Sequence, residues 1–516
     1  MRFASTALAA LGFVALAACS ASPDDGASTG EAAATQAAFP NDFLFGSAIA
    51  GFQVDMGCPT IEAAACEDRN SDWYQWITTK RVLDNPLLFM SKDPPKSGPG
   101  FFETYEKDLD HAGPELGANS LRLSIEWSRV FPNATWGVTD HEALKKLASP
   151  EGLEFYHRVF AAMKQRGLVP FVTVNHYTLP LWVHDGNACN EDLDKCIADG
   201  KGGWADPNRD RITNEIAKYA GFVAKEFGGE VDRWATLNEP FSAVVLPGYI
   251  IDTPMRSNPP GRSALWMDVD GAHTAASAMV EAHAKMYDAI KANDPGSEVG
   301  IVYAFSDIVP ASPSEKEVAD HAQYIFHDMF MDGIVFGKLD EKWNGQPTNR
   351  PDIKGKVDFI GANYYFRFTA KKSWAGLFLG GISPFLDFDM GAGFEGTPKG
   401  LQATLHRIAQ RYHLPIYVSE TGADQANEEA GAAWMVQTME QVKSSIAAGD
   451  DIRGYYAWTL MDNYEWNHGM QMKMGLYAVD PSTKARRARP AADALGQMMR
   501  AKDVPAELSR KYASFY

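Results

Sequence analysis

Two glutamates, Glu239 and Glu420, each stand at the end of a short apolar run and are the side chains best placed to do chemistry. Glu239 closes RWATLNEP (233–240) and Glu420 closes PIYVSETG (415–422), and a Pro or Gly then breaks each strand-like run. Active-site residues of parallel barrels lie at the C-terminal ends of strands. A lone glutamate there is usually an ordinary strand-end carboxylate, but two that meet can act as acid/base and nucleophile on a glycosidic bond.

The elements that must position these glutamates form a repeating pattern of strands and helices. Amphipathic helical stretches such as 151–167, 211–228 and 268–293 separate the apolar runs. Eight strands are predicted, at 43–53, 120–127, 169–177, 233–240, 298–306, 358–365, 415–422 and 452–463. Eight strands with helices between them and no second-domain break predict one α/β domain, a (β/α)8 TIM barrel over residues 40–516.

Two insertions interrupt this pattern. Residues 54–100 follow the first predicted strand, so we expect them to lie over the catalytic face of the barrel. Residues 371–398 follow the sixth strand and contain the apolar run WAGLFLGGISPFLDFDM. That run could wall an apolar leaving-group site, touch a membrane, or simply pack on the barrel rim.

Composition restricts the class of partner. The chain has 516 residues, 45% hydrophobic and 22% charged, which is enough for a large packed core. Its net charge of −18 argues against nucleic acid and against electrostatic binding to anionic membranes. The aromatic content of 12% suits a carbohydrate site, because sugar C–H faces stack on aromatic rings.

The N-terminus has the pattern of a targeting segment. Residues 1–18 carry Arg2 and a short apolar run, and they end in Leu-Ala-Ala before Cys19. This segment resembles a bacterial lipoprotein signal peptide, which implies that Cys19 is lipidated and that Ser20 favours export to the outer membrane. Residues 19–39 are small and polar, as in a flexible tether. An ordinary secreted protein with a chance cysteine is the alternative.

The remaining cysteines fall into two close pairs. In an oxidising periplasm, disulfides Cys58–Cys66 and Cys189–Cys196 are the simplest pairing. A metal site is the weaker alternative, because neither pair has the C-x-x-C spacing of a metal site.

Six segments together resemble glycoside hydrolase family 1, the β-glucosidase and β-galactosidase family. They are WSRVFP (127–132), NHYTLPLWV (175–183), TLNEP (236–240), DFIGANYY (358–365), VSETG (418–422) and AWTLMDNYEW (457–466). The resemblance runs from about residue 40 to about residue 500 in the family's order and spacing, and such extended agreement is more specific than any one motif.

The resemblance assigns roles to matching positions. It implies that Glu239 is the general acid/base and Glu420 the nucleophile of a retaining mechanism, with their carboxyl groups about 5–5.5 Å apart. Arg122 and Tyr365 are expected beside Glu420, and Asn238 is expected to bind the sugar 2-hydroxyl. The other implied site residues are Gln53, His176, Glu465 and Trp466 for the remaining hydroxyls, Trp458 for stacking beneath the sugar, and Asn363 as a supporting residue.

Several positions depart from the family pattern. Thr421 stands where the family usually has Asn, Tyr177 where many members have Trp, and Met470 and Met474 where aromatic residues are expected. Met474 is expected on the 6-hydroxyl side of the sugar pocket. Glu465 would repel a sugar phosphate, which favours an unphosphorylated substrate.

The resemblance therefore predicts an exo-β-glycosidase that releases β-D-glucose or a related sugar from an oligosaccharide or an aryl or alkyl β-glycoside. It implies no metal and no organic cofactor. A transglycosylase on the same scaffold and a non-catalytic sugar-binding lipoprotein are the alternatives. The second of these would be expected to lack a catalytic group, and none is missing.

Overall fold

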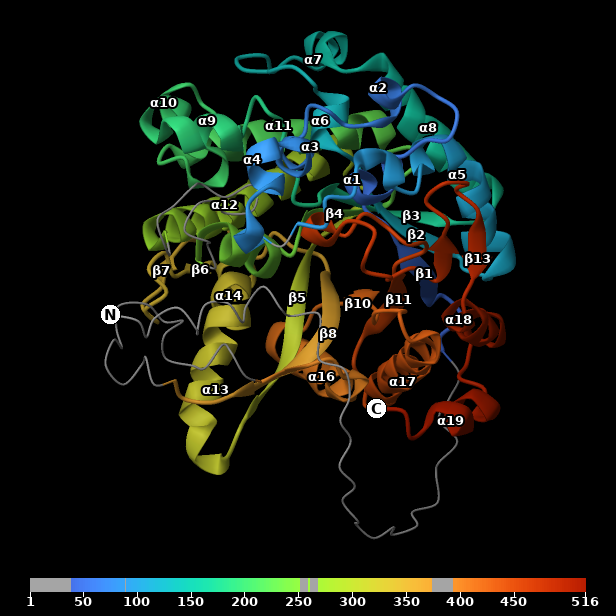
Figure 1. The fold of residues 1–516 in the computed structure, drawn as a ribbon. Coiled ribbons are helices and arrows are strands. Elements are labelled where there is room, and N and C mark those ends of the chain that lie inside the picture. Colours follow the sequence, from blue (N-terminus) through green and yellow to red (C-terminus); the bar gives the residue numbers. More distant parts are fainter. Residues whose placement is uncertain (1–38, 89, 251–258, 260–267, 374–392) are drawn as a thin grey trace.

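Eight parallel strands close into a barrel that is surrounded by helices (Figure 1). The structure is a computed structural model and describes residues 39–88, 90–250, 259, 268–373 and 393–516. The barrel strands are β1 (Leu44–Ala48), β2 (Ser120–Ser124), β3 (Val169–Asn175), β4 (Arg233–Asn238), β5 (Glu298–Pro310), β8 (Ile360–Ala370), β10 (Ile416–Thr421) and β11 (Ile452–Trp458). All eight predicted strands are present, so the predicted (β/α)8 fold is confirmed.

Several predicted strand ends are wrong, and β1, β2 and β11 each end several residues before the predicted end. Gln53 lies in α1 (Gly51–Asp55) and Trp127 opens α6 (Trp127–Val130), so the sheet ends several residues before each of them. A continuous apolar run cannot by itself distinguish a buried strand from a short buried helix, and here it covers both.

Pairing between β8 and β10 closes the barrel. Ile416 pairs with Ile360 and Glu420 with Asn363, and the register shifts between Val418 and Glu420. A shift of this kind re-aims side chains at the end of a strand. It therefore sets the direction in which the Glu420 side chain points from β10.

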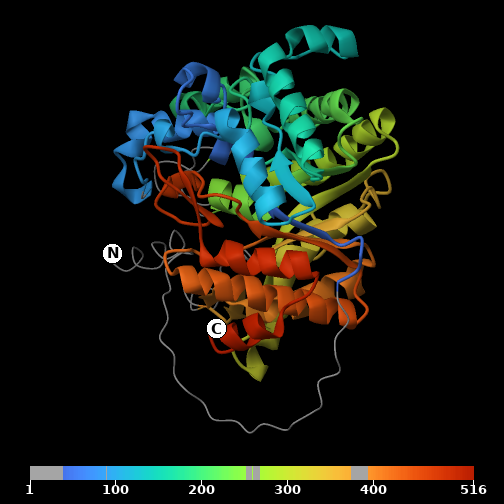
Figure 2. The ribbon, with the colours of Figure 1, turned by 90° about the vertical axis from the view of Figure 1, so that its right-hand side faces the viewer.

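Each barrel strand is followed by a helix that packs on the outside. These helices are α5 (Phe101–Asp110), α8 (Pro150–Gln165), α11 (Arg209–Phe227), α12 (Val269–Asn293), α14 (Met329–Phe336), α16 (Leu401–Tyr412), α17 (Glu428–Ala447) and α18 (Pro490–Ala501). The sequence explains such helices locally. The Ser149 hydroxyl caps α8 by accepting from Gly152 N at 3.0 Å, and Pro150 takes its first position. In Figures 1 and 2, α17 and α18 lie side by side, and they pack against each other.

The remaining α-helices and strands of the described chain are shorter. They are α2 (Ala63–Cys66), α3 (Asp72–Thr78), α4 (Lys80–Leu83), α7 (His141–Leu147), α9 (Gly186–Glu191), α10 (Leu193–Ala198), α13 (Lys316–Gln323), α19 (Ala506–Tyr512), and strands β6 (Lys338–Leu339), β7 (Thr348–Asn349), β9 (Phe394–Glu395), β12 (Tyr477–Val479) and β13 (Arg486–Ala488).

Aromatic rings fill the barrel interior. Phe171 lies edge-on to Phe359, Tyr417 and Tyr456, with ring centroids 5.4 to 5.8 Å apart. Phe359 and Tyr417 also contact each other edge-on at 5.2 Å. Trp458 belongs to the same buried cluster and ends β11. This packing forms a rigid floor for the catalytic end of the barrel.

The insertion at 54–100 lies over the catalytic end, as predicted. Ser71 forms a bridge with Pro180 beyond β3, and Trp73 packs on Trp466 beyond β11 at 4.5 Å. The Tyr464 hydroxyl donates to the carbonyl of Asp93 at 2.6 Å. The insertion is therefore attached to the loops of at least two other strands.

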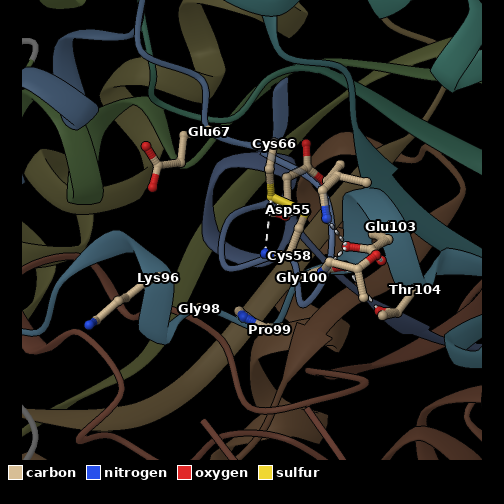
Figure 3. The surroundings of a disulfide bond; sticks show 12 residues. Asp55, Cys58, Cys66, Glu67, Lys96, Gly98, Pro99, Gly100, Glu103 and Thr104 are labelled. Atoms are coloured by element: carbon tan, nitrogen blue, oxygen red, sulfur yellow. Dashed lines mark hydrogen bonds between the residues drawn. A yellow bond between two sulfur atoms is a disulfide. The ribbon is translucent and has the colours of Figure 1, made fainter. Parts of the chain in front are cut away.

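Both predicted disulfides are present in the structure. Cys58–Cys66 closes the turn after α1, and Cys58 N donates to Cys66 Sγ at 3.2 Å (Figure 3). Glu103, on α5, holds the same turn by accepting from Thr60 N at 3.0 Å. Cys189–Cys196 joins α9 to α10.

Some sequence predictions fall outside the described residues. The signal segment, Cys19 and nearly all of the tether lie there, as does most of the apolar 371–398 insertion. Within the described residues, no helix combines the length and apolar character needed to span a bilayer.

Candidate active site

Glu239 lies at the break between β4 and the π-helical turn Pro240–Ile250. Its φ of 43° is uncommon for a residue with a side chain, and it turns the carboxyl group away from the strand direction. Asn363 Nδ2 donates to Oε1 at 2.8 Å, and the Tyr177 hydroxyl donates to Oε2 at 2.7 Å. Burial, followed by the nearby charge of Glu420, raises the pKa of Glu239 to about 7. Glu239 can therefore carry a proton near neutral pH.

Glu420 has the opposite kind of environment. Arg122 Nη1 lies 2.5 Å from Glu420 Oε1, and both side chains are almost fully buried. The Tyr365 hydroxyl donates to Glu420 Oε2 at 2.8 Å. Each carboxyl oxygen of Glu420 thus meets a hydrogen-bond donor, and one of these donors is a buried cation. The two glutamates are thus arranged for unequal roles, an acid and a nucleophile.

Arg122 links the two halves of the site. It extends from β2, and its Nη2 donates to Asn238 Oδ1 at 2.7 Å while its Nε donates to Thr173 Oγ1 at 3.1 Å. Asn238 Nδ2 in turn donates to the Tyr177 hydroxyl at 2.9 Å and to His176 Nε2 at 3.4 Å. The amide of Asn238 is therefore already engaged by protein groups, so binding a 2-hydroxyl would require one of these bonds to lengthen.

A second polar group gathers around Glu465, in the loop after β11. Gln53 Nε2 donates to Glu465 Oε2 at 3.1 Å, and Asn463 Nδ2 donates to the same atom at 2.8 Å. Burial raises the pKa of Glu465 to about 7. This side chain can accept hydrogen bonds from a ligand when ionised, and it can donate one when protonated.

Three flat rings lie next to these polar groups. The His176 ring is close to parallel to the indoles of Trp458 and Trp466, with centroids 5.8 and 6.1 Å away. Burial and the nearby Arg122 charge lower the pKa of His176 well below its usual value, so the ring is neutral. Because its Nε2 accepts from Asn238, the proton of the neutral ring lies on Nδ1.

Three buried polar atoms of this cluster have no hydrogen-bond partner among the described residues. They are Gln53 Oε1, His176 Nδ1 and Asn463 Oδ1. Leaving buried polar atoms unpaired is costly, so their gathering in one place indicates that a ligand completes them. Two acceptors and one donor beside aromatic rings match a compound with several hydroxyl groups and an apolar face.

The structure thus brings the predicted catalytic and sugar-binding residues together, and it adds three that the sequence does not assign. Tyr177 departs from the Trp that the resemblance leads one to expect, and it contacts Glu239. Asn463 lies next to Glu465, and Ser419 Oγ donates to Asn363 Oδ1 at 2.8 Å, which orients the Asn363 amide toward Glu239. The available signal is closeness in the chain to a predicted site residue: Ser419 precedes Glu420, Asn463 is two residues before Glu465, and Tyr177 follows His176.

The comparisons with known proteins decide the family. The model of glycosyl hydrolase family 1 matches residues 35–504. The chain belongs to glycosyl hydrolase family 1. A β-galactosidase of Saccharolobus solfataricus is 34% identical over 487 residues, covering 88% of this chain and 93% of that protein. β-Glucosidase A of Thermotoga maritima is 26% identical over 480 residues, covering 87% and 94%.

Solved structures agree with this family 1 assignment. The β-glycosidase of Thermosphaera aggregans matches with a TM-score of 0.79 and 29% identity, over 92% of this chain and 99% of that one. The β-glucosidase of Pyrococcus furiosus matches with a TM-score of 0.76 and 30% identity, over 92% and 98%.

The departures from the family 1 pattern have local explanations. Thr421 is buried and its Oγ1 accepts from Trp434 Nε1 of α17 at 2.9 Å, so it anchors the strand end on a helix. Met474 is 5% exposed and packs in the cluster that contains Trp458, whereas Met470 packs in the main core. The expected position of Met474 beside a sugar 6-hydroxyl stays a prediction. Within the described chain, no three His, Cys, Asp or Glu side chains gather as metal ligands would.

Proposed function

We propose that this family 1 chain is a retaining exo-β-glycosidase. It releases a terminal non-reducing β-D-glucosyl residue, or a closely related sugar, from an oligosaccharide or an aryl or alkyl β-glycoside. The observation that carries this proposal is the unequal pair of carboxyl groups. Glu239 is buried with a pKa of about 7, and Glu420 is held by Arg122 and Tyr365.

The mechanism follows from this inequality. Glu420 attacks the anomeric carbon while Glu239 gives its proton to the departing glycosidic oxygen, which leaves a covalent glycosyl-enzyme. Glu239, now a carboxylate, then takes a proton from water as the water oxygen attacks the same carbon and Glu420 leaves. Two displacements at one carbon retain the configuration.

The polar cluster supports a neutral sugar. Gln53, His176 and Asn463 supply the unpaired donors and acceptors that sugar hydroxyls need. Glu465 lies beside them, and Trp458 and Trp466 supply flat surfaces. The carboxyl group of Glu465 disfavours a phosphate at this point. The relatives carry the names β-galactosidase and β-glucosidase, so either hexose is compatible with family membership, and glucose is the proposal.

We place the protein on the periplasmic side of a bacterial envelope, tethered through a lipid on Cys19. The support is the Leu-Ala-Ala-Cys segment, the small polar residues that follow it, and two disulfides within the catalytic domain. Disulfides persist in oxidising compartments, which suits an exported protein.

A panel of aryl β-glycosides tests the activity. Glucoside, galactoside, fucoside, mannoside and xyloside would be incubated with wild type, Glu420→Ala and Glu239→Ala. Glu420→Ala should abolish turnover, and added azide should restore product with inverted configuration, because azide takes the space of the lost nucleophile. Glu239→Ala should keep activity only on substrates with a good leaving group. Equal turnover by all three proteins would contradict the proposal.

A further inference from the structure

Tyr177 occupies an unusual place beside the acid/base glutamate. It follows β3 with a φ of 73°, a left-handed conformation that few residues with side chains adopt. The residue is 6% exposed, and its ring packs on His176 at 4.6 Å and on Trp466 at 4.9 Å. This packing holds the hydroxyl group in one position, next to Glu239 Oε2.

The direction of the hydrogen bond between Tyr177 and Glu239 follows from its neighbours. The guanidinium of Arg122 can only donate, so Asn238 must present Oδ1 to it. Asn238 therefore turns its Nδ2 toward the Tyr177 oxygen, which accepts. A phenol has a single proton, and here it is left free to point at Glu239 Oε2, 2.7 Å away.

These bonds form one continuous path between the two glutamates. Glu420 receives from Arg122, Arg122 donates to Asn238, Asn238 donates to Tyr177, and Tyr177 donates to Glu239. Every donor along the path has one orientation, so the carboxyl group of Glu239 meets a fixed dipole. A fixed donor stabilises a carboxylate more than it stabilises the protonated acid.

We propose that Tyr177 is a positioning residue that orients Glu239 and favours its ionised form, the form in which Glu239 acts as a base on water. The inference rests on the proposed function. Tyr177 keeps its own proton in both displacements, since the proton that leaves Glu239 goes to the glycosidic oxygen and the proton that returns comes from water. Burial, reinforced by the charge of Glu239, raises the pKa of the Tyr177 phenol well above its usual value, which agrees with a permanent donor.

Other charged and titratable groups also surround Glu239, and the experiment must separate them. They are Glu420 on β10, Arg122 on β2, His176 after β3, Tyr365 on β8 and Glu465 after β11. His176 is hydrogen-bonded to Asn238. An acid is needed only when the leaving group is poor. A fall in kcat/KM at high pH that occurs with a poor leaving group, and is absent with dinitrophenolate, therefore belongs to Glu239.

The test compares wild type with Tyr177→Phe, which keeps the ring packing and removes the hydroxyl. With a poor leaving group, the alkaline limb of the kcat/KM profile should move up by about one pH unit, because a hydrogen bond to a charged group has been lost. With dinitrophenyl glycosides, kcat and KM should both fall about 10-fold, because the glycosyl-enzyme accumulates when its hydrolysis is slowed. Tyr365→Phe is the matched variant, and its alkaline limb should stay in place.

An alkaline limb of Tyr177→Phe that stays in place or moves down would overturn the inference. Replacing Tyr177 by 3-fluorotyrosine keeps every contact and makes the phenol a stronger donor, so the limb should then move down. This second variant decides the matter if Tyr177→Phe does not fold. If wild type hydrolyses no β-glycoside at all, the proposed function fails instead, which is a separate result.

Discussion

Arg122 and Glu420 form an ion pair with a separation of 2.5 Å at the centre of the barrel mouth, and both side chains are shielded from solvent. Their strands are far apart in the sequence, and the guanidinium also donates to Asn238. Such a pair stabilises the fold only while both partners are present, because one charge left alone in the interior is costly.

Arg122→Met should therefore damage both activity and stability. We expect kcat/KM to fall at least about 100-fold and the free energy of unfolding to fall by about 3 kcal/mol, because Glu420 loses its buried counter-charge. Aryl glycoside kinetics and urea unfolding measure the two effects. Arg233→Met, at the opposite end of the barrel, removes an arginine paired with Glu298 and should change kcat/KM by less than about 3-fold. Equal effects of the two substitutions would contradict the role of Arg122.

Ser419→Ala should weaken the hydrogen bond from Asn363 to Glu239, although Ser419 does not itself contact Glu239. The Ser419 hydroxyl fixes the Asn363 amide, and the loss of one such hydrogen bond is worth about 1 kcal/mol, or about a 5-fold fall in kcat/KM for a poor leaving group. Ser419→Thr keeps the hydroxyl and should retain most of the activity. If Ser419→Ala matches wild type on poor leaving groups, then Asn363 is oriented by other contacts.

Glu465→Ala should discriminate between sugars. We expect Glu465 to bind hydroxyls on the side of the exocyclic CH2OH group. Its loss should therefore lower kcat/KM about 100-fold for a β-glucoside and clearly less for a β-xyloside, which lacks that group. The ratio of the two kcat/KM values is the measurement. An unchanged ratio would place the 6-hydroxyl elsewhere in the pocket.

Ionisation of the buried Glu126 should lower the free energy of unfolding as the pH rises. Burial raises the pKa of this carboxyl group to about 7, although it accepts from Ser124 Oγ at 2.8 Å and Thr178 Oγ1 at 2.6 Å. Its pKa is higher in the folded chain than in the unfolded chain, where it is near 4.5. The folded state therefore holds a proton that the unfolded state releases, and the free energy of unfolding falls as the pH rises from about 4.5 to about 7.

Glu126→Gln removes this contribution. Between pH 5 and pH 8, the free energy of unfolding should fall in both proteins, but by on the order of 3 kcal/mol less in the variant than in wild type. Equilibrium urea unfolding measures this difference. Glu142→Gln, on the exposed face of α7, should leave the wild-type pH dependence in place. If the free energy of unfolding has the same pH dependence in wild type and Glu126→Gln, then this carboxyl group has the same pKa in the folded and unfolded chains.

Cys19→Ala should release the protein from membranes. The lipid is proposed to be the anchor, so the variant should appear in the soluble periplasmic fraction with unchanged activity. Fractionation of cells expressing each form measures this. A variant that stays in the membrane fraction would show that residues other than Cys19 bind it there.

The sequence predicted the strands well and the site contacts only in part. Each barrel strand is a buried apolar run bounded by breakers, and such runs are visible in a sequence. The contact of Tyr177 with Glu239 depends on two residues that adopt positive φ angles after different strands, and no local pattern encodes that pairing. Gln53 ends a predicted strand but lies in a helix, because apolar residues continue past the turn. Thr421 departs from the family pattern, and its partner Trp434 comes from α17, which no local pattern around Thr421 indicates.

Closure of the barrel by β8 and β10 has a consequence for how activity arises during synthesis. Glu239 leaves the ribosome long before Glu420, and Asn363 can support Glu239 only after β8 has found its place between β5 and β10. A nascent or truncated chain that stops before β10 contains the acid and its partners but no nucleophile. Turnover therefore reports that the chain extends through β10 and that the ring is closed, so an activity assay also measures successful folding.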